Sequence, residues 1–298
     1  MRSLVLALCL MASSVLASPR ESLVVDTAWL ARHLKDPNLV LLHVGDKADY
    51  AAKHIPGARH VALADISLRG ELMLEMPPAD DLRQRLENLG ISNDSRVIVY
   101  YGKDWVSPTT RVIFTLDYAG LGDQASLLDG GMDAWIAAGN KVVDVVPEPK
   151  KGTLAALKLK PIIVTGDQVR ERMGKKGFAI VDGRSASLYD GVDTGGMPEH
   201  PHKTGHIAGA GSVPFSEVVD DKNQVKSSDE LKALFAKAGV KPGDTVIAYC
   251  HIGQQATATL FVARSLGYPV LLYDGSFEDW SRREDAPVEN PSAKKEQK

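Results

Sequence analysis

The segment that decides the fold is TVIAYCHIGQQA, residues 245–256. Its first part, residues 245–249, is mostly apolar, and a helical pattern over residues 257–266 follows and stops at Gly267. An apolar strand that leads into a helix predicts a parallel α/β unit. Cys250 begins the connecting loop at the carboxyl end of the strand, where ligands bind in open α/β sheets.

The two halves of the chain share this pattern. Four landmarks recur in one order, which indicates a duplication. They are a strand (residues 40–44 and 179–182), a turn with a His-Ile pair (54–58 and 205–210), a second strand (96–101 and 245–250) and an Asp-Gly turn before a tryptophan (128–135 and 273–280). Amphipathic helical patterns lie between the strands at residues 80–89 and 228–238. We predict an α/β fold with two tandem domains, each a mostly parallel sheet flanked by helices.

Sequence signals at the two ends of the chain and at its centre predict a leader, a linker and a tail. A basic start, an apolar run over residues 4–11 and small residues up to Ala17 predict a signal peptide over residues 1–17, cleaved after Ala17. We therefore expect a periplasmic or secreted protein whose mature form has lost Cys9 and keeps one thiol, Cys250. The N-terminal domain is assigned to residues 18–146, a linker rich in proline and charge to 147–160, the C-terminal domain to 161–290, and a disordered tail to 291–298.

Composition excludes several classes of protein. The chain has 298 residues, of which 44% are hydrophobic and 24% charged, with a net charge of −3. Such a balance is typical of globular domains and provides no basic surface for nucleic acid. Two cysteines exclude a disulfide scaffold and a thiolate metal cluster. No segment after the leader has the ~18 apolar residues of a membrane span, so we expect no membrane in the mature form.

Two interpretations of Cys250 arise from its position. Loop amides and a helix N-terminus form a positive concavity, in which a thiolate accepts N–H groups and the thiol ionises more easily. Alternatively, the cysteine is a small buried hydrophobe of the sheet. The first half has Tyr101 at the equivalent place, so sheet packing alone does not require a cysteine there.

Several short motifs carry a resemblance to a known family. They are VDGR (181–184), GHIAGA (205–210), PF (214–215), YC (249–250), YDGS with its tryptophan (273–280) and PVE (287–289). As an ordered set they resemble the tandem rhodanese family of sulfurtransferases over nearly all of the mature chain. The resemblance implies a non-catalytic N-terminal domain, a catalytic C-terminal domain and a site between them.

By this resemblance Cys250 is the catalytic residue. It takes sulfane sulfur from thiosulfate, 3-mercaptopyruvate or a related donor as a persulfide, and a thiol or cyanide then accepts it. The resemblance implies no cofactor and no metal, and we expect a monomer with small-molecule partners. The residues expected to bind the substrate and the persulfide are His251, Ile252, Gly253, Gln254, Gln255 and Ala256.

Other residues are expected to support the loop. Asp182 and Arg184 match a family motif, and we predict an ion pair between them, with anion steering as a second role of Arg184. Asp274 is predicted to buttress the active loop. Trp105 and Arg111 follow Tyr101 and could face the site from the first domain, although only their position indicates this.

The sequence also departs from the family. Thiosulfate enzymes carry an Arg-Lys pair after the cysteine and mercaptopyruvate enzymes carry Gly-Ser, whereas this chain has His251 and Ile252. Both groups place a substrate-binding arginine before the tyrosine equivalent to Tyr189, where this chain has Leu188. An anionic donor therefore loses familiar cationic contacts. His251 either supplies a partial charge or hydrogen bond, or is a solvent-exposed loop histidine.

Three further hypotheses compete with efficient sulfur transfer. A phosphatase or arsenate reductase needs an arginine six residues after the cysteine, and Ala256 stands there. A sulfur carrier with low turnover remains open, because the missing cations favour it. For His200, His202 and His206, a zinc site is a less favoured interpretation than a surface loop, because closed zinc sites use four ligands.

Overall fold

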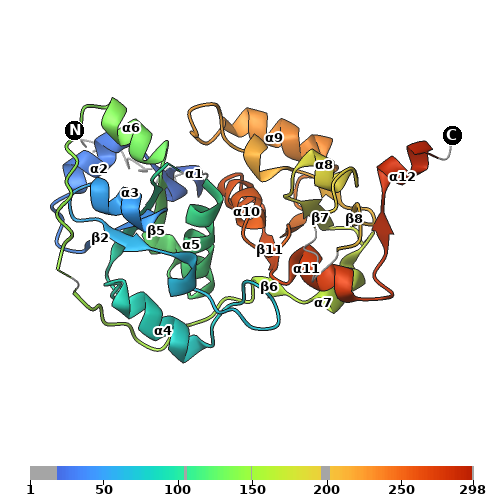
Figure 1. Ribbon diagram of the computed structural model, residues 1–298, viewed down its shortest axis with the longest axis horizontal. Helices are drawn as coiled ribbons and strands as arrows, with labels where there is room; N and C mark the ends of the chain where they lie inside the picture. The colour runs from blue at the N-terminus through green and yellow to red at the C-terminus, as the bar shows by residue number, and fades with distance from the viewer. Residues whose placement is uncertain (1–18, 104–105, 149, 196–201, 297–298) are drawn as a thin grey trace, which may run out of the picture.

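The computed structural model describes residues 19–103, 106–148, 150–195 and 202–296 (Figure 1). The predicted signal peptide and Trp105 therefore lie outside the described residues. The first domain consists of α1 (Pro19–Leu23), β1 (Val24–Val25), α2 (Thr27–His33), β2 (Leu39–Val44), α3 (Lys47–Ala52), β3 (Arg59–Val61), η1 (Leu63–Asp65), α4 (Ala79–Asn88), β4 (Arg96–Tyr101), α5 (Val106–Tyr118), η2 (Gly122–Gln124), β5 (Ala125–Leu128) and α6 (Gly131–Ala137). The second consists of β6 (Ile163–Val164), α7 (Gly166–Arg172), β7 (Phe178–Asp182), α8 (Ala186–Tyr189), β8 (His206–Ile207), β9 (Gly211–Ser212), η3 (Phe215–Glu217), α9 (Ser228–Lys237), β10 (Thr245–Tyr249), α10 (Ala256–Ser265), β11 (Val270–Tyr273), α11 (Ser276–Arg282), β12 (Val288–Glu289) and α12 (Pro291–Glu296).

Each domain contains one five-stranded parallel sheet with the same topology. The strand order is β1-β5-β4-β2-β3 in the first domain and β6-β11-β10-β7-β9 in the second. All neighbouring strands in both sheets are parallel. The strand β4, which ends at Tyr101, and the strand β10, which directly precedes Cys250, are central in their sheets. The predicted fold class, with two α/β domains and helices flanking parallel sheets, is confirmed (Figure 1).

The duplication extends to individual hydrogen bonds. The buried hydroxyl of Tyr100 accepts the amide of Ile55 at 3.1 Å, and the hydroxyl of Tyr249 accepts the amide of Ile207 at 3.0 Å. Each tyrosine lies at the carboxyl end of the central strand of its sheet and binds the backbone of the His-Ile turn. Two of the landmarks recognised in the sequence, the second strand and the His-Ile turn, are therefore joined by the same hydrogen bond in both domains.

Local signals place most element ends within a residue or two of their predicted positions. The helix predicted over residues 228–238 is α9, where Ser227 and Glu230 form a reciprocal capping box. At the C-terminal end the structure differs from the sequence prediction. Residues 291–296 form α12 rather than a disordered tail, because the side chain of Asn290 accepts the amide of Ala293 at 3.0 Å and Pro291 suits the first helical position.

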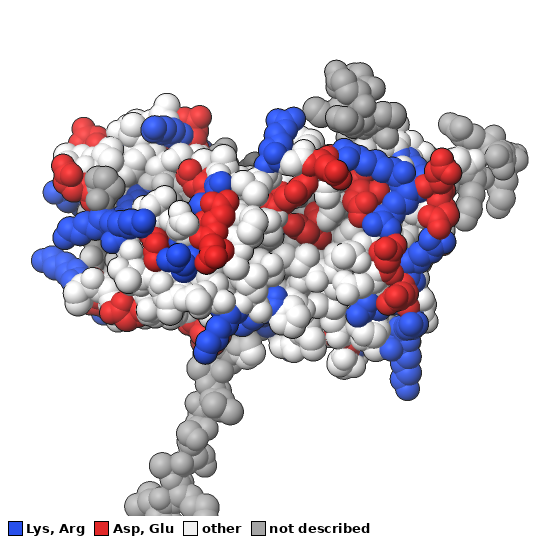
Figure 2. All heavy atoms as spheres, turned by 90° about the horizontal axis from the view of Figure 1, so that it is seen from below, with Lys and Arg blue, Asp and Glu red and all other residues white. Residues whose placement is uncertain are grey.

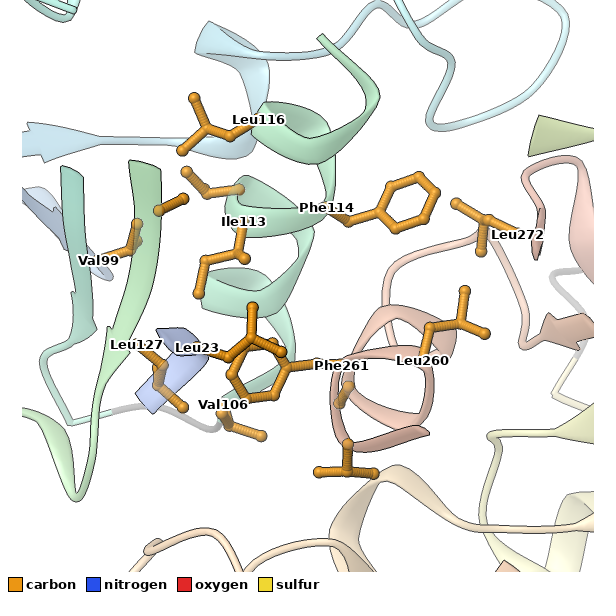
Figure 3. Packing of buried hydrophobic residues seen from close by; sticks show 14 of the residues in the cluster. Leu23, Val99, Val106, Ile113, Phe114, Leu116, Leu127, Leu260, Phe261 and Leu272 are labelled. Atoms are coloured by element: carbon orange, nitrogen blue, oxygen red, sulfur yellow. The ribbon is translucent and has the colours of Figure 1, made fainter. Parts of the chain in front are cut away.

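The two domains share one apolar cluster between α5 and α10. Phe114 on α5 points toward Leu260 and Leu272 of the second domain, and Phe261 on α10 lies near Leu23 of the first (Figure 3). A buried hydrogen bond of 2.9 Å joins Thr110 and Thr257 across the same interface. Burial of these side chains from both domains favours one fixed arrangement of the two sheets.

Two hairpin-like loops reinforce this arrangement reciprocally. The loop closed by the Leu68–Glu75 bridge in the first domain donates the amide of Met73 to Glu278 on α11 at 3.0 Å. The loop closed by the Val219–Val225 bridge in the second donates the amide of Val225 to Asp129 at 2.8 Å. Each domain therefore donates a loop amide to a carboxylate that follows the strand β5 or β11 of the other domain.

The connecting segment and the surface complete the description. Residues predicted as a linker lie along the first domain, where Gly152 and Leu154 donate their amides to Glu87 at 2.7 and 3.0 Å. Figure 2 shows charges of both signs interspersed on one face of the molecule. Among the helices of the described residues, none has the length and apolar character needed to cross a membrane.

Candidate active site

Cys250 follows the central strand β10 directly and is tied at both backbone groups to the start of α11. Its amide donates to the Ser276 hydroxyl at 3.1 Å, and its carbonyl accepts the amide of Phe277 at 2.9 Å. The residue is fully buried, with an exposed fraction of 0%. The thiol is therefore held in place and shielded from bulk water, and a donor must reach it through the residues that cover the loop.

The loop after Cys250 presents main-chain donors without protein partners. Within the described part of the chain, no hydrogen bond is found for the amide N–H groups of residues 251–255. Gly253 has φ of +80°, a left-handed conformation that favours glycine and lets the loop curl. The helix α10 begins at Ala256 and adds its positive N-terminal end. Successive amides without protein partners are the kind of donors from which anion-binding loops are built.

An ion pair between Asp182 and Arg184 lies beside the loop. The carboxylate accepts from the guanidinium at 2.6 to 3.1 Å, and the two residues are 0% and 1% exposed. The guanidinium carbon stands 4.0 Å from the ring centroid of Phe277. Burial opposes the charge on Arg184, yet Asp182 raises the pKa of Arg184 above its ordinary value, and Cys250 acts in the same direction. The predicted ion pair is present, and the Asp182 carboxylate balances the charge of Arg184 near Cys250.

The first domain contributes Arg111 to the loop. Arg111 on α5 is 0% exposed. Its Nη1 donates hydrogen bonds to the Gly253 carbonyl at 3.0 Å and to the Asp274 carboxylate at 2.6 Å. Two other guanidinium nitrogens, Nε and Nη2, are buried without a hydrogen-bond partner in the described residues. Asp274 also touches the loop, since a Cβ on Gly253 would lie 2.7 Å from its carbonyl oxygen. The ion pair therefore joins the loop, the second domain and the first domain.

His251 is partly buried and uncharged near neutral pH. Burial lowers the pKa of His251 to about 4, and Arg184 and His202 act in the same direction. The ring centroids of His251 and His202 are 4.9 Å apart, and the backbone of Gly195 lies against the His251 ring. Its buried Nδ1 has no hydrogen-bond partner among the residues described. His251 is thus neither a cation nor the solvent-exposed loop residue considered from the sequence.

Comparison with known proteins agrees with this geometry. A model of the rhodanese-like domain matches residues 26–138 and again residues 165–283. The chain belongs to the rhodanese family. Both domains of this rhodanese are covered: the first match includes Arg111, and the second includes Cys250, Asp182, Arg184 and Asp274.

Similar proteins show the same two-domain extent. The sulfur carrier protein TtuD of Thermus thermophilus is 31% identical over 278 residues, which cover 89% of this rhodanese and 95% of that protein. The thiosulfate sulfurtransferase of Rattus norvegicus is 30% identical over 285 residues, covering 89% and 93%. The crystal structure of YnjE superimposes with a TM-score of 0.82 at 25% identity, over 93% of this chain and 70% of that one. With several relatives named as such enzymes, the present rhodanese is a sulfurtransferase.

The remaining predicted loop residues have distinct surroundings in this rhodanese. Gln254 donates its side-chain amide to the Ser107 hydroxyl of the first domain at 3.2 Å. Ile252 and Gln255 are partly buried, and Ala256 is buried at the start of α10. Ser107 and Arg111 of the first domain therefore both hydrogen-bond to the loop that follows Cys250. Sequence reasoning named Arg111 by position alone and missed Ser107; a lone arginine in the middle of an apolar helix was the available signal.

The histidines considered as zinc ligands do not form one site within the described residues. His206 is 3% exposed, donates its Nδ1–H to the Tyr189 carbonyl at 2.8 Å, and stacks on the Tyr189 ring with 3.7 Å between the ring centroids. His202 lies beside His251 instead, and His200 is outside the described residues. No group of three or more possible metal ligands is found in the part of the chain that the structure describes.

Proposed function

We propose that this rhodanese transfers sulfane sulfur through a persulfide on Cys250. The observation that carries the proposal is the row of unpartnered amides at residues 251–255 next to a buried thiol at the end of β10. Such donors stabilise a thiolate before the reaction and the terminal sulfur of a persulfide after it. A buried cysteine with only a packing role has no need of them.

The reaction has two steps. The Cys250 thiolate attacks the outer sulfur of a donor, a new S–S bond forms, and the donor leaves with the electron pair of its broken bond. A thiol or cyanide then attacks the outer sulfur of the persulfide and releases the Cys250 thiolate. Sulfur passes as a neutral atom in both steps, so no external oxidant or reductant is required.

The surrounding residues position this chemistry. Arg111 holds the Gly253 carbonyl on its side of the loop, and because the C=O and N–H of a trans peptide point in opposite directions, the next amide faces away from Arg111. Asp182 keeps Arg184 in place against Phe277. We assign a non-catalytic role to the first domain, in which Tyr101 occupies the cysteine position and donates its hydroxyl to the Asn223 carbonyl at 2.5 Å.

Mass spectrometry with a single variant tests the proposal. Wild-type protein treated with a sulfur donor is expected to gain the mass of one sulfur atom on Cys250 and to lose it on addition of cyanide. Cys250→Ser should gain none and should retain the far-ultraviolet circular dichroism of the wild type. Sulfur transfer by the serine variant would remove Cys250 from the mechanism.

A carrier role is the second candidate, because the relative from Thermus thermophilus bears the name of a sulfur carrier protein. A carrier loads Cys250 but releases the sulfur to cyanide or small thiols slowly. If sulfur loads onto Cys250 and is released to a small thiol at similar rates, the result supports an enzymatic role. Rapid loading followed by slow release supports a carrier role.

We also propose export of the protein with removal of residues 1–17. The basic start, apolar run and small residues before position 18 support it. N-terminal sequencing of protein recovered from the periplasm or medium of an expressing bacterium should begin at Ser18. A full-length chain confined to the cytoplasm would contradict the proposal.

A further inference from the structure

The helices α4 and α9 end in the same way in the two domains. Gly90 after α4 and Gly239 after α9 have φ of +83° and +82°, a left-handed conformation that ends a helix. Their amides donate to the carbonyls of Glu87 and Ala236 at 2.8 and 3.0 Å. The central strands β4 and β10 begin a few residues further on, so both glycines lie at the amino-terminal edge of their sheets. The two helix ends are therefore equivalent points of the duplicated fold.

In the first domain the connecting segment covers this point. Residues 150–155 pass the end of α4 (Figure 1), and Gly152 donates its amide to the Glu87 carbonyl at 2.7 Å. Gly152 also lies directly against the Ile91 carbonyl, and the side chain of Leu154 is 6% exposed. A piece of chain outside any helix or strand is thus bound across the helix end through its backbone and one apolar side chain.

The equivalent point of the second domain is open within the part of the chain that the structure describes. Gly239 is exposed, and a Cβ on it would meet no atom within 4 Å. In the first domain the guanidinium of Arg59 occupies the place that a Cβ on Gly90 would take, and it donates to the Lys150 carbonyl at 2.6 Å. Gly211 stands at the position of Arg59 in the second His-Ile turn. A hollow of about 660 Å³ therefore lies beside Gly239.

This hollow has an excess of positive charge. We call it the basic groove, and its charged lining consists of Arg172, Lys175, Lys176, Lys241 and Asp244. Among the residues described, the three lysines form no ion pair, and Arg172 meets only the 69% exposed Glu171 at 4.0 Å. A smaller hollow adjoins the groove and holds Lys237 with Glu217 and Glu289, so the excess is confined to the groove itself. Such a patch attracts acidic groups.

We propose that the basic groove binds an acidic peptide segment of a partner protein, as the first domain binds residues 150–155. The repeat explains the change of charge. In the first domain the Ser92 hydroxyl accepts the Thr153 amide at 3.0 Å, and Lys241 stands at the position of Ser92 in the second. A carboxylate of the bound segment therefore finds a cation where the connecting segment uses a neutral hydrogen bond. Phe178 in the same groove offers an apolar contact for a side chain equivalent to Leu154.

The position of the groove leaves the active site accessible. The groove lies at the amino end of β10 and Cys250 at the carboxyl end, and five strand residues between them span about 16 Å. The ends of this chain do not match the groove in charge. Residues 1–17 contain one charged side chain, Arg2, and residues 294–298 contain three lysines and one glutamate. A separate acidic partner is therefore the occupant that fits.

Two labelled peptides of opposite charge test the proposal. The first, Glu-Glu-Gly-Thr-Leu-Ala-Glu-Glu, follows residues 150–155 with glutamates in place of the two lysines and two more at its end. The second carries lysines at the same four positions. Fluorescence anisotropy at low salt should give a Kd at least tenfold lower for the acidic peptide, and this preference should shrink as salt is added. Absent binding, or equal binding of the two peptides, overturns the proposal.

Charge reversal provides the matched variants. Lys175→Glu combined with Lys241→Glu should weaken binding of the acidic peptide at least tenfold. Lys47→Glu combined with Lys53→Glu changes two exposed lysines of the first domain and should leave the Kd unchanged. Both double variants should keep wild-type circular dichroism and sulfur transfer to cyanide, because neither pair lies at the Cys250 loop.

Two results would contradict this assignment of the groove. The first is acidic-peptide binding that the Lys175→Glu and Lys241→Glu changes do not weaken. The second is a wild-type dimer in sedimentation velocity that the same changes convert to a monomer, since the groove would then bind a second copy of this chain.

Discussion

Arg111 of the first domain and Asp274 of the second form a buried ion pair of 2.6 Å whose guanidinium also holds the Gly253 carbonyl at 3.0 Å. The loop that follows Cys250 is therefore shaped by a residue from the other half of the duplicated chain. A domain without a cysteine at the equivalent position therefore still contributes to the loop of the domain that has one. The position of α5 against the second domain and the conformation of the loop depend on the same contacts.

Arg111→Met should weaken both stability and sulfur transfer. Leaving Asp274 without its partner is expected to reduce the free energy of unfolding by about 3 kcal/mol, and transfer should fall at least tenfold as the loop loosens. Arg264→Met is the matched control, because Arg264 also pairs across the domains, with Asp117 at 3.2 Å, but does not hydrogen-bond to the loop. Urea unfolding and cyanide-dependent turnover measure the two effects. Equal transfer by both variants would contradict a positioning role for Arg111.

Gly253→Ala should abolish most sulfur transfer. Alanine is strained by roughly 1–2 kcal/mol in the left-handed conformation, and its Cβ would lie 2.7 Å from the Asp274 carbonyl oxygen. Gly243→Ala provides the control, since Gly243 has φ of +86° but open space around a Cβ. Both variants should unfold at lower urea concentration, and only the first should lose turnover. An active Gly253→Ala protein would mean that loop curvature is not required.

Asp182→Asn should destabilise the second domain strongly. It removes the carboxylate from a fully buried pair and leaves the Arg184 charge uncompensated, a change expected to lower the unfolding free energy by about 3–5 kcal/mol. Asp49→Asn breaks a surface ion pair with Lys103, in which the two side chains are 37% and 64% exposed. This change should alter the unfolding free energy by less than about 1 kcal/mol. Chemical unfolding of the two variants decides the comparison; similar losses would show that the buried pair has no special role.

Acid should destabilise the protein well before its carboxylates titrate. Burial lowers the pKa of His43 to about 4, with His60 and His54 acting in the same direction, and the pKa of His251 is also lowered to about 4. In the unfolded chain histidine titrates near pH 6.5, so the unfolded state binds more protons between pH 6.5 and 4 and stability falls as the pH decreases.

For His43 alone the expected loss between about pH 7.5 and pH 5 is about 2 kcal/mol. Urea unfolding at the two pH values should show that His43→Gln loses less stability on acidification than the wild type. A His43→Gln protein that is as acid-sensitive as the wild type would show that this histidine does not control the effect.

Local pattern predicted the framework of the site well. β4 has the predicted bounds, and the strand predicted up to Cys250 is β10, which ends one residue earlier. Hydrophobic runs, glycine stops and the Ser227 capping box are encoded within a few residues, so they are readable without tertiary contacts. The tail was predicted wrongly as disordered because the Asn290 cap that begins α12 is a single weak signal beside a polar run.

Long-range contacts were not readable in the same way. From the sequence Arg111 was one charged residue on an apolar helix, and its role depends on Asp274, which lies 163 positions further along the chain. The state of His251 depends on burial by Gly195 and on the nearby Arg184 and His202. Residue type and spacing do not determine such surroundings.

The amino-acid sequence by itself therefore determined the duplicated α/β architecture, the strand–loop–helix unit and the cysteine at its turn, because these follow from hydrophobic periodicity and turn chemistry along the chain. Tertiary structure alone decided that the thiol is buried, that each nearby arginine is neutralised and that the first domain completes the loop. Burial and electrostatics depend on which distant groups pack together, and in a low-dielectric interior those groups set the charge of the site.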